Sequence, residues 1–145
     1  MSNKSIKTIT TAILALISLF IGSQYFDSSV ENINVDIQSS IEQLYATRQS
    51  GIMVEFDGVV VKLLSDDLDG SRHQRFIVKL NSGHTVLIAH NIDLAPRVPL
   101  EKGKKVFIYG QYEWNDRGGV VHWTHKDPRG THEEGWIQFQ GQKYE

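Results

Sequence analysis

The feature that most constrains the fold is a series of strand-like segments in the second half of the chain. Each segment is rich in β-branched and aromatic residues, and turn residues lie between the segments. The predicted strands are residues 53–64, 75–80, 85–89, 105–112 and 120–124, with 136–139 as a short sixth. Short strands at this spacing favour a β-sandwich or a barrel over a fold with alternating helices.

The first predicted strand, residues 53–64, is long and carries Gly58 near its middle. A glycine inside a strand indicates a bulge or a sharp bend. Residues 90–100, between the third and fourth strands, hold Pro96 and Pro99, which make a long helix there unfavourable. The sequence therefore predicts a mainly β fold, a small five- to six-stranded OB-fold-like barrel. A small SH3-like barrel or an open β-roll is the alternative.

The N-terminus predicts an export signal or a membrane anchor. Residues 8–26 carry no charge, and Lys4 and Lys7 precede them. Lysines are held on the cytoplasmic side while an apolar stretch enters the membrane, so the rest of the chain is delivered outside. The stretch is close to the ~20 residues that span a bilayer, and small residues at 22–23 suit cleavage although Ile21 does not. The prediction covers both a cleaved signal and a retained anchor, with a buried helix of a soluble domain as the alternative.

These patterns divide the chain into three parts. Residues 1–26 are predicted to be the signal peptide or N-terminal membrane anchor, 27–50 a linker and amphipathic helix, and 51–145 the barrel domain. The helix is predicted over residues 36–49 because its apolar residues share one face. These residues are Ile37, Ile41, Leu44 and Tyr45. We expect a periplasmic or extracytoplasmic protein whose N-terminal segment has the cytoplasmic membrane as its partner.

Charge and cysteine content exclude several classes of protein. Fifteen basic and seventeen acidic side chains give a net charge of −2, which argues against nucleic acid as a partner. The absence of cysteine excludes disulfides, thiolate metal sites and a cysteine nucleophile. No Gly-x-Ser-x-Gly motif and no phosphate-binding loop of the P-loop type is present.

The densest group of chemically active residues lies between positions 122 and 132. The candidate metal ligands are His122, His125, Asp127 and His132, joined by His90 from the end of the third strand. Imidazoles and a carboxylate are the usual ligands of a divalent transition metal where thiolates are absent. His122 and His125 can converge only if the strand ends and the chain turns, because residues three apart on a strand face opposite sides. The alternative is a structural loop whose histidines bond backbone groups.

A second set of residues predicts ligand binding. Guanidinium groups match phosphate or carboxylate, and aromatic faces stack on sugars or bases. The candidate ligand-binding residues are Arg72, His73, Arg75, His90, Asn91, Asp93, Arg97, Trp114 and Trp123. The alternatives are surface ion pairs, such as Arg97 with Asp93, and tryptophans that fill the core. Asp67 and Asp69 resemble part of a calcium loop but lack its remaining ligands, which favours a solvated hairpin tip.

Four segments together resemble a known bacterial family. They are residues 71–77 (SRHQRFI), 89–97 (AHNIDLAPR), 118–125 (GGVVHWTH) and 135–137 (GWI). The chain is similar over residues 51–144 to the domain-of-unknown-function family 3465, which has a His-Trp-Thr-His motif. Lys126 departs from it, since a further histidine is expected there. The resemblance implies a small exported or anchored bacterial protein and no particular activity.

Three functions follow as hypotheses. The first is a binding module in the bacterial envelope that takes an anionic or sugar-like ligand. The second is a metal-dependent hydrolase with phosphodiesters as the candidate substrate, Glu133 or Glu134 as general base and Arg72 or Arg75 stabilising the developing charge. The third is a structural partner of another envelope protein. The first two require the imidazole and guanidinium groups to gather at one mouth of the barrel.

Overall fold

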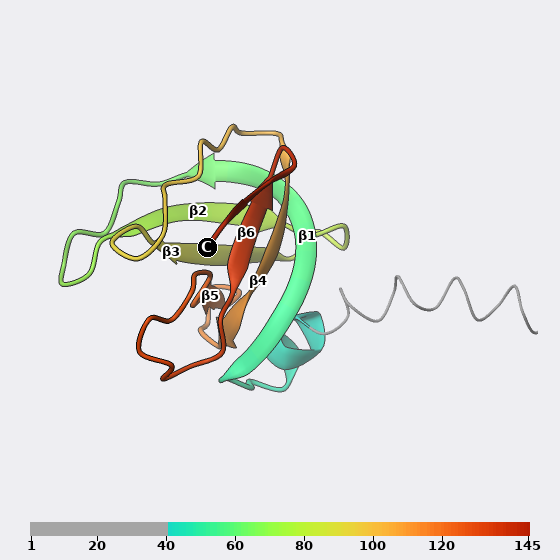
Figure 1. The fold of residues 1–145 in the computed structure, drawn as a ribbon. Helices are drawn as coiled ribbons and strands as arrows, with labels where there is room; N and C mark the ends of the chain where they lie inside the picture. Colours follow the sequence, from blue (N-terminus) through green and yellow to red (C-terminus); the bar gives the residue numbers. More distant parts are fainter. Residues whose placement is uncertain (1–40) are drawn as a thin grey trace, which may run out of the picture. The chain divides into compact units, whose positions relative to one another are not determined.

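A computed structural model describes residues 41–145 (Figure 1). Its strands are β1 (Ile52–Leu63), β2 (His73–Lys79), β3 (Thr85–Asn91), β4 (Lys105–Glu113), β5 (Val120–His122), β6 (Trp136–Phe139) and β7 (Gln142–Tyr144). Residues 41–46 are helical and lie within the predicted helix. Within residues 41–145, no helix is long and apolar enough to cross a membrane. The predicted signal or anchor lies outside the described residues.

Five of the strands form a closed barrel. They pair in the order β1-β2-β3-β5-β4, and β4 pairs again with β1. The β3–β5 pairing is parallel, whereas the other pairings of the barrel are antiparallel. The hairpin of β6 and β7 extends the sheet beside the first half of β4 (Figure 1). The prediction of an OB-fold-like barrel is confirmed, and β7 is a strand that the sequence analysis missed.

The long first strand, β1, pairs with two other strands because it bends. Residues 52–59 pair with β4, and residues 59–63 pair with β2. The register with β2 shifts between Val60 and Lys62, which marks a bulge next to the bend. Gly58 lies just before this change of partner, as the sequence predicted. A Cβ on Gly58 would lie 2.5 Å from Val78 Cγ1 and 2.8 Å from the Lys79 carbonyl oxygen.

Gly58→Ala is therefore expected to lower the free energy of unfolding by about 1–3 kcal/mol, the usual cost of overpacking. The added methyl group would collide with β2, and the backbone of Lys79 cannot move aside as a side chain could. Urea unfolding monitored by circular dichroism measures the change. Glu55→Ala, at an exposed position of the same strand, is the control and should change stability by no more than about 0.5 kcal/mol. Equal stability of the two variants would contradict a close β1–β2 approach.

The core lies inside the barrel, where alternate residues of each strand are buried. Val54, Phe56 and Val60 of β1 share this core with residues of every other strand. The helical segment adds Ile41 and Leu44, which confirms two members of its predicted apolar stripe. The segment between β3 and β4 is irregular, as the prolines predicted. The buried Gln74 amide holds it in place by donating to the Val98 carbonyl and accepting from the Val98 amide.

Candidate functional site

The chain turns sharply within the His-Trp-Thr-His segment. β5 ends at His122, two residues earlier than predicted, because Trp123 adopts a left-handed backbone conformation with φ of 52°. This conformation costs a non-glycine residue about 1–2 kcal/mol, so the surrounding packing must hold it. The turn brings Thr124 and His125 into buried positions, whereas His122 faces the outer side of the barrel. The predicted turn is present, but it directs His122 and His125 to different surroundings.

His90 is a residue of the core. It is fully buried, with Nδ1 2.8 Å from the Thr124 hydroxyl and Nε2 3.1 Å from the Pro96 carbonyl oxygen. A carbonyl only accepts, so Nε2 donates to Pro96 and Nδ1 accepts from the hydroxyl of Thr124. Burial lowers the pKa of His90 to about 4, which keeps the imidazole neutral at pH 7. Both ring nitrogens are used in these hydrogen bonds, which favours the structural alternative for His90 over binding of a metal or ligand.

The remaining histidines of the predicted metal cluster, His122, His125 and His132, make ring contacts with one another or with Trp123. Trp123 stacks on His132 with ring centroids 4.2 Å apart, and the rings of His125 and His132 are nearly perpendicular with centroids 5.3 Å apart. Nδ1 of His125 donates to the Lys126 carbonyl, and Nδ1 of His132 donates to the Glu133 carbonyl. Of the residues from 41 to 145, no three carboxylate or imidazole side chains are arranged to hold a metal ion. This arrangement matches the alternative of a hydrogen-bonded structural loop.

Asp127 organises the same loop. Its carboxylate accepts hydrogen bonds from the backbone amides of Arg129, Thr131 and His132. Burial alone would raise the pKa of the Asp127 carboxyl, but these hydrogen bonds outweigh burial and hold that pKa well below its usual range. The carboxylate therefore stabilises the loop, and its Oδ2 also lies 4.0 Å from Nε2 of His132, another predicted metal ligand.

All three candidate arginines lie in ion pairs, and Nη1 of Arg75 is 4.0 Å from the Asp67 carboxylate. Arg72 Nε lies 2.6 Å from the Asp93 carboxylate, and Arg97 pairs with Asp66. These pairs join the loop after β1 to the segment after β3, and they replace the expected pairing of Arg97 with Asp93. The side-chain oxygen of Asn91 accepts a hydrogen bond from the backbone amide of Asp93 at 2.9 Å, which stabilises the turn after β3. These residues therefore connect the two loops of the barrel to each other.

The two candidate tryptophans are half-buried and pack on neighbouring side chains. The Trp114 ring stacks on Tyr45 at 6.5 Å, and its Nε1 donates to the Tyr45 carbonyl at 3.1 Å. The guanidinium of Arg48 lies 5.2 Å from the same ring. Trp114 thus attaches the N-terminal helical residues to the barrel, and Trp123 is covered on one face by His132. Neither ring forms the exposed platform that the sequence suggested.

Three predicted residues do gather in one cleft on the outer side of the barrel. We call it the outer cleft; its volume is about 320 Å³. It is lined by Asp67, His73, Arg75, Ala89, Glu113, Val120 and His122. His73, Arg75 and His122 belonged to the candidate sets, whereas Ala89, Glu113 and Val120 were missed. Outward positions in the alternation of each strand are the sequence pattern that identifies them.

The outer cleft contains one polar atom that lacks a partner. Nε2 of His122 is buried, and within residues 41–145 it has no hydrogen-bond partner. The nearest carboxylate oxygen, Glu113 Oε1, lies 3.7 Å away. Burial lowers the pKa of His122, and the Glu113 carboxylate opposes this only in part, so the ring is neutral at pH 7. Such unsatisfied groups are rare in native structures and mark places where a further group fits.

A family model described as "Protein of unknown function (DUF3465)" matches residues 25–145. The match covers all of the described barrel. No curated protein matches the chain.

Proposed function

The chain belongs to the DUF3465 family of proteins of unknown function, and we propose that its barrel is a binding module for a small sugar-like ligand. The ligand occupies the outer cleft. The module works outside the cytoplasmic membrane, because residues 8–26 have the layout of an export signal or anchor. OB-fold barrels commonly bind oligonucleotides and oligosaccharides on this side, an analogy of fold that supports the location only.

The unpartnered Nε2 of His122 is the observation that carries the proposal. A buried nitrogen without a partner loses about 1–3 kcal/mol relative to one that is hydrogen-bonded. A ligand hydroxyl in the cleft restores the missing bond, because a hydroxyl both donates and accepts. Ala89 and Val120 supply an apolar surface beside it, which suits the C–H face of a sugar ring.

Charge decides between the two ligand classes expected from the sequence. The outer cleft holds the carboxylates of Asp67 and Glu113 and one guanidinium, that of Arg75. Arg75 also donates its Nε to the Ser65 carbonyl at 3.0 Å. The carboxylates therefore outnumber the guanidinium, which already faces Asp67 at 4.0 Å, and this opposes an anion and favours an uncharged hydroxyl-rich ligand.

Titration calorimetry of the full chain tests the proposal. We expect saturable binding of at least one of di-N-acetylchitobiose, maltose and cellobiose, and none of inorganic phosphate. His122→Ala should weaken that binding by about tenfold, equivalent to about 1.4 kcal/mol, by removing the nitrogen that faces the ligand. The same variant should remain folded, with a midpoint lowered only by the lost contact between the His122 and Trp123 rings, because Nε2 makes no hydrogen bond within the described chain.

The outcomes separate the hypotheses. Binding of phosphate with no response to the sugars would favour an anion site and contradict the proposal. An absence of binding with all four probes would also contradict it and would leave the role of a structural partner for another protein.

A further inference from the structure

We infer that the outer cleft is one end of a longer glycan-binding track, which follows the outer side of β4 to a second pocket. This inference rests on the proposed function, and it specifies the ligand as an oligosaccharide of several rings. The track consists of Phe107, Tyr109, Gln111 and Glu113 of β4, His122 of β5, and Trp136 and Gln138 of β6.

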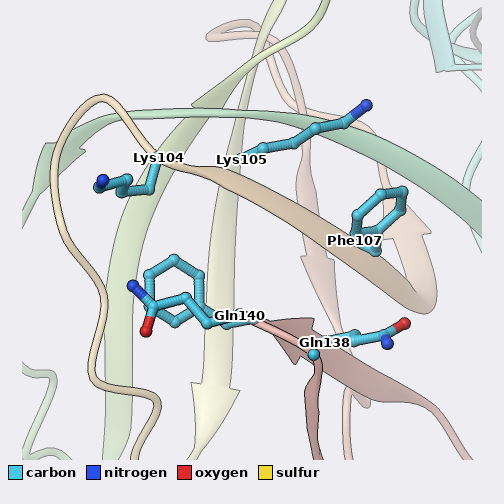
Figure 2. Close-up of a pocket in the computed structure, with 7 residues that line it drawn as sticks. Lys104, Lys105, Phe107, Gln138 and Gln140 are labelled. Carbon is cyan, nitrogen blue, oxygen red and sulfur yellow. The ribbon is translucent and has the colours of Figure 1, made fainter.

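The second pocket lies at the start of β4 and has a volume of about 430 Å³ (Figure 2). Lys104, Lys105 and Phe107 line it on the β4 side. Gln138 to Gly141, at the tight turn between β6 and β7, line the other side. The Lys105 ammonium lies 5.0 Å from the centroid of the Phe107 ring, whereas the amides of Gln138 and Gln140 lie along the opposite side (Figure 2). Phe107 is 44% exposed, although it is a large aromatic residue in the middle of a sheet.

Strand pairing connects this pocket to the outer cleft without a break. On the outward side of β4, Phe107 pairs with Gln138 and Tyr109 pairs with Trp136. The next outward residue, Gln111, pairs with His122 of the outer cleft. From Lys105 to Glu113 the strand spans about 27 Å at the usual rise per residue. That length exceeds a single sugar ring several times over.

The side chains along the track suit an uncharged polymer with flat rings. Tyr109 and Trp136 lie with ring centroids 6.1 Å apart, and both are partly exposed beside Phe107. Aromatic faces pack against the apolar face of a sugar ring, and the amides of Gln111 and Gln138 bond its hydroxyls.

Charges along the track are of mixed sign, which disfavours a nucleic acid. Lys105 pairs with Asp57 at 3.0 Å, and the ammonium of Lys143 lies 4.8 Å from the Trp136 ring. Glu133 accepts a hydrogen bond from the Tyr109 hydroxyl, and Glu113 adds a second carboxylate at the far end. A polyanion binds by neutralising its phosphates with a basic surface, and this surface does not provide one.

The test compares oligomers of β-1,4-linked N-acetylglucosamine with two and six units, titrated into the full chain. We expect the six-unit oligomer to bind at least tenfold more tightly than the two-unit oligomer. Phe107→Ala should weaken six-unit binding by about tenfold and leave two-unit binding in the outer cleft unchanged. His122→Ala should weaken both. Leu94→Ala, a change of a residue with similar exposure away from the track, is the control and should weaken neither.

Each other result overturns a defined part of this account. Equal loss of two-unit and six-unit binding in Phe107→Ala, or no loss at all, would overturn the track and leave the outer cleft intact. Failure of both oligomers to bind, together with failure of the other disaccharides, would overturn the proposed function and the track together. Tighter binding of a single-stranded oligothymidine than of the six-unit oligomer would replace the glycan with a nucleic acid and overturn the inference.

Discussion

Acidification from pH 7 to pH 4 is expected to lower the free energy of unfolding by about 3 kcal/mol through His90 alone. Burial lowers the pKa of His90 from 6.5 to about 4 in the folded barrel. Between these two values the unfolded chain binds a proton that the folded barrel excludes. The stabilisation is therefore fully present above pH 6.5, and it is lost by about 1.4 kcal/mol per unit as pH falls toward 4.

The variant His90→Gln isolates this contribution, because a glutamine amide has a donor and an acceptor but does not titrate in this range. Urea unfolding at a series of pH values gives the free energy of unfolding as a function of pH. The slope of this dependence should be shallower for the variant, by an amount equivalent to up to one proton. His122 and His125 have pKa values lowered by burial too, so part of the slope should persist in the variant. Parallel slopes for the two proteins would show that His90 is accessible to protons and would contradict its place in the core.

Gly135→Ala is expected to cost about 3 kcal/mol or more, the upper end of the range for overpacking. A Cβ at this position would lie 2.1 Å from the Trp123 carbonyl oxygen and 2.4 Å from the Tyr109 carbonyl oxygen. Both oxygens belong to the backbone, so no side chain can move aside. The substitution should release the loop that follows the His-Trp-Thr-His segment from β4.

Gly130→Ala is the matched control, because it lies in the same loop with no atom within 4 Å of an added Cβ. Its backbone has φ of 64°, so we expect a cost of only about 1–2 kcal/mol from strain. Thermal unfolding followed by near-ultraviolet circular dichroism compares the two, since Trp123 reports on the loop. Equal destabilisation by the two substitutions would show that the loop does not pack closely on β4.

The fold was predictable because its determinants are local. Alternation defined the inner face of each strand, and Gly58 marked the bend that allows one strand to pair with two neighbours. β5 ends two residues earlier than predicted because Trp123 adopts a left-handed conformation. Packing imposes this conformation, and a tryptophan in the sequence does not predict it. β7 was missed because residues 142–144 are short and mostly polar, with two of the three exposed.

The site was predictable only in part, because ligand residues depend on which surfaces meet. His73 and Arg75 were predicted in one candidate set and His122 in another, and the structure brings the three to one cleft from β2 and β5, which flank β3. The role of His90 was open to deduction, because it follows Val86 and Ile88 on the inward side of β3. The ion pairs of Arg72 and Arg97 could not be predicted from the sequence, because the geometry of the loops determines which carboxylate each guanidinium reaches.

Methyl NMR of the full chain during titration with di-N-acetylchitobiose, maltose and cellobiose tests the occupancy of the outer cleft most directly. The methyl groups of Ala89 and Val120 line the outer cleft, whereas those of Val106 lie in the core. We expect the first two residues to shift and saturate with a disaccharide while Val106 stays unchanged. Shifts that saturate elsewhere in the barrel, or no shift of Ala89 and Val120 with any of the three sugars, would contradict the account.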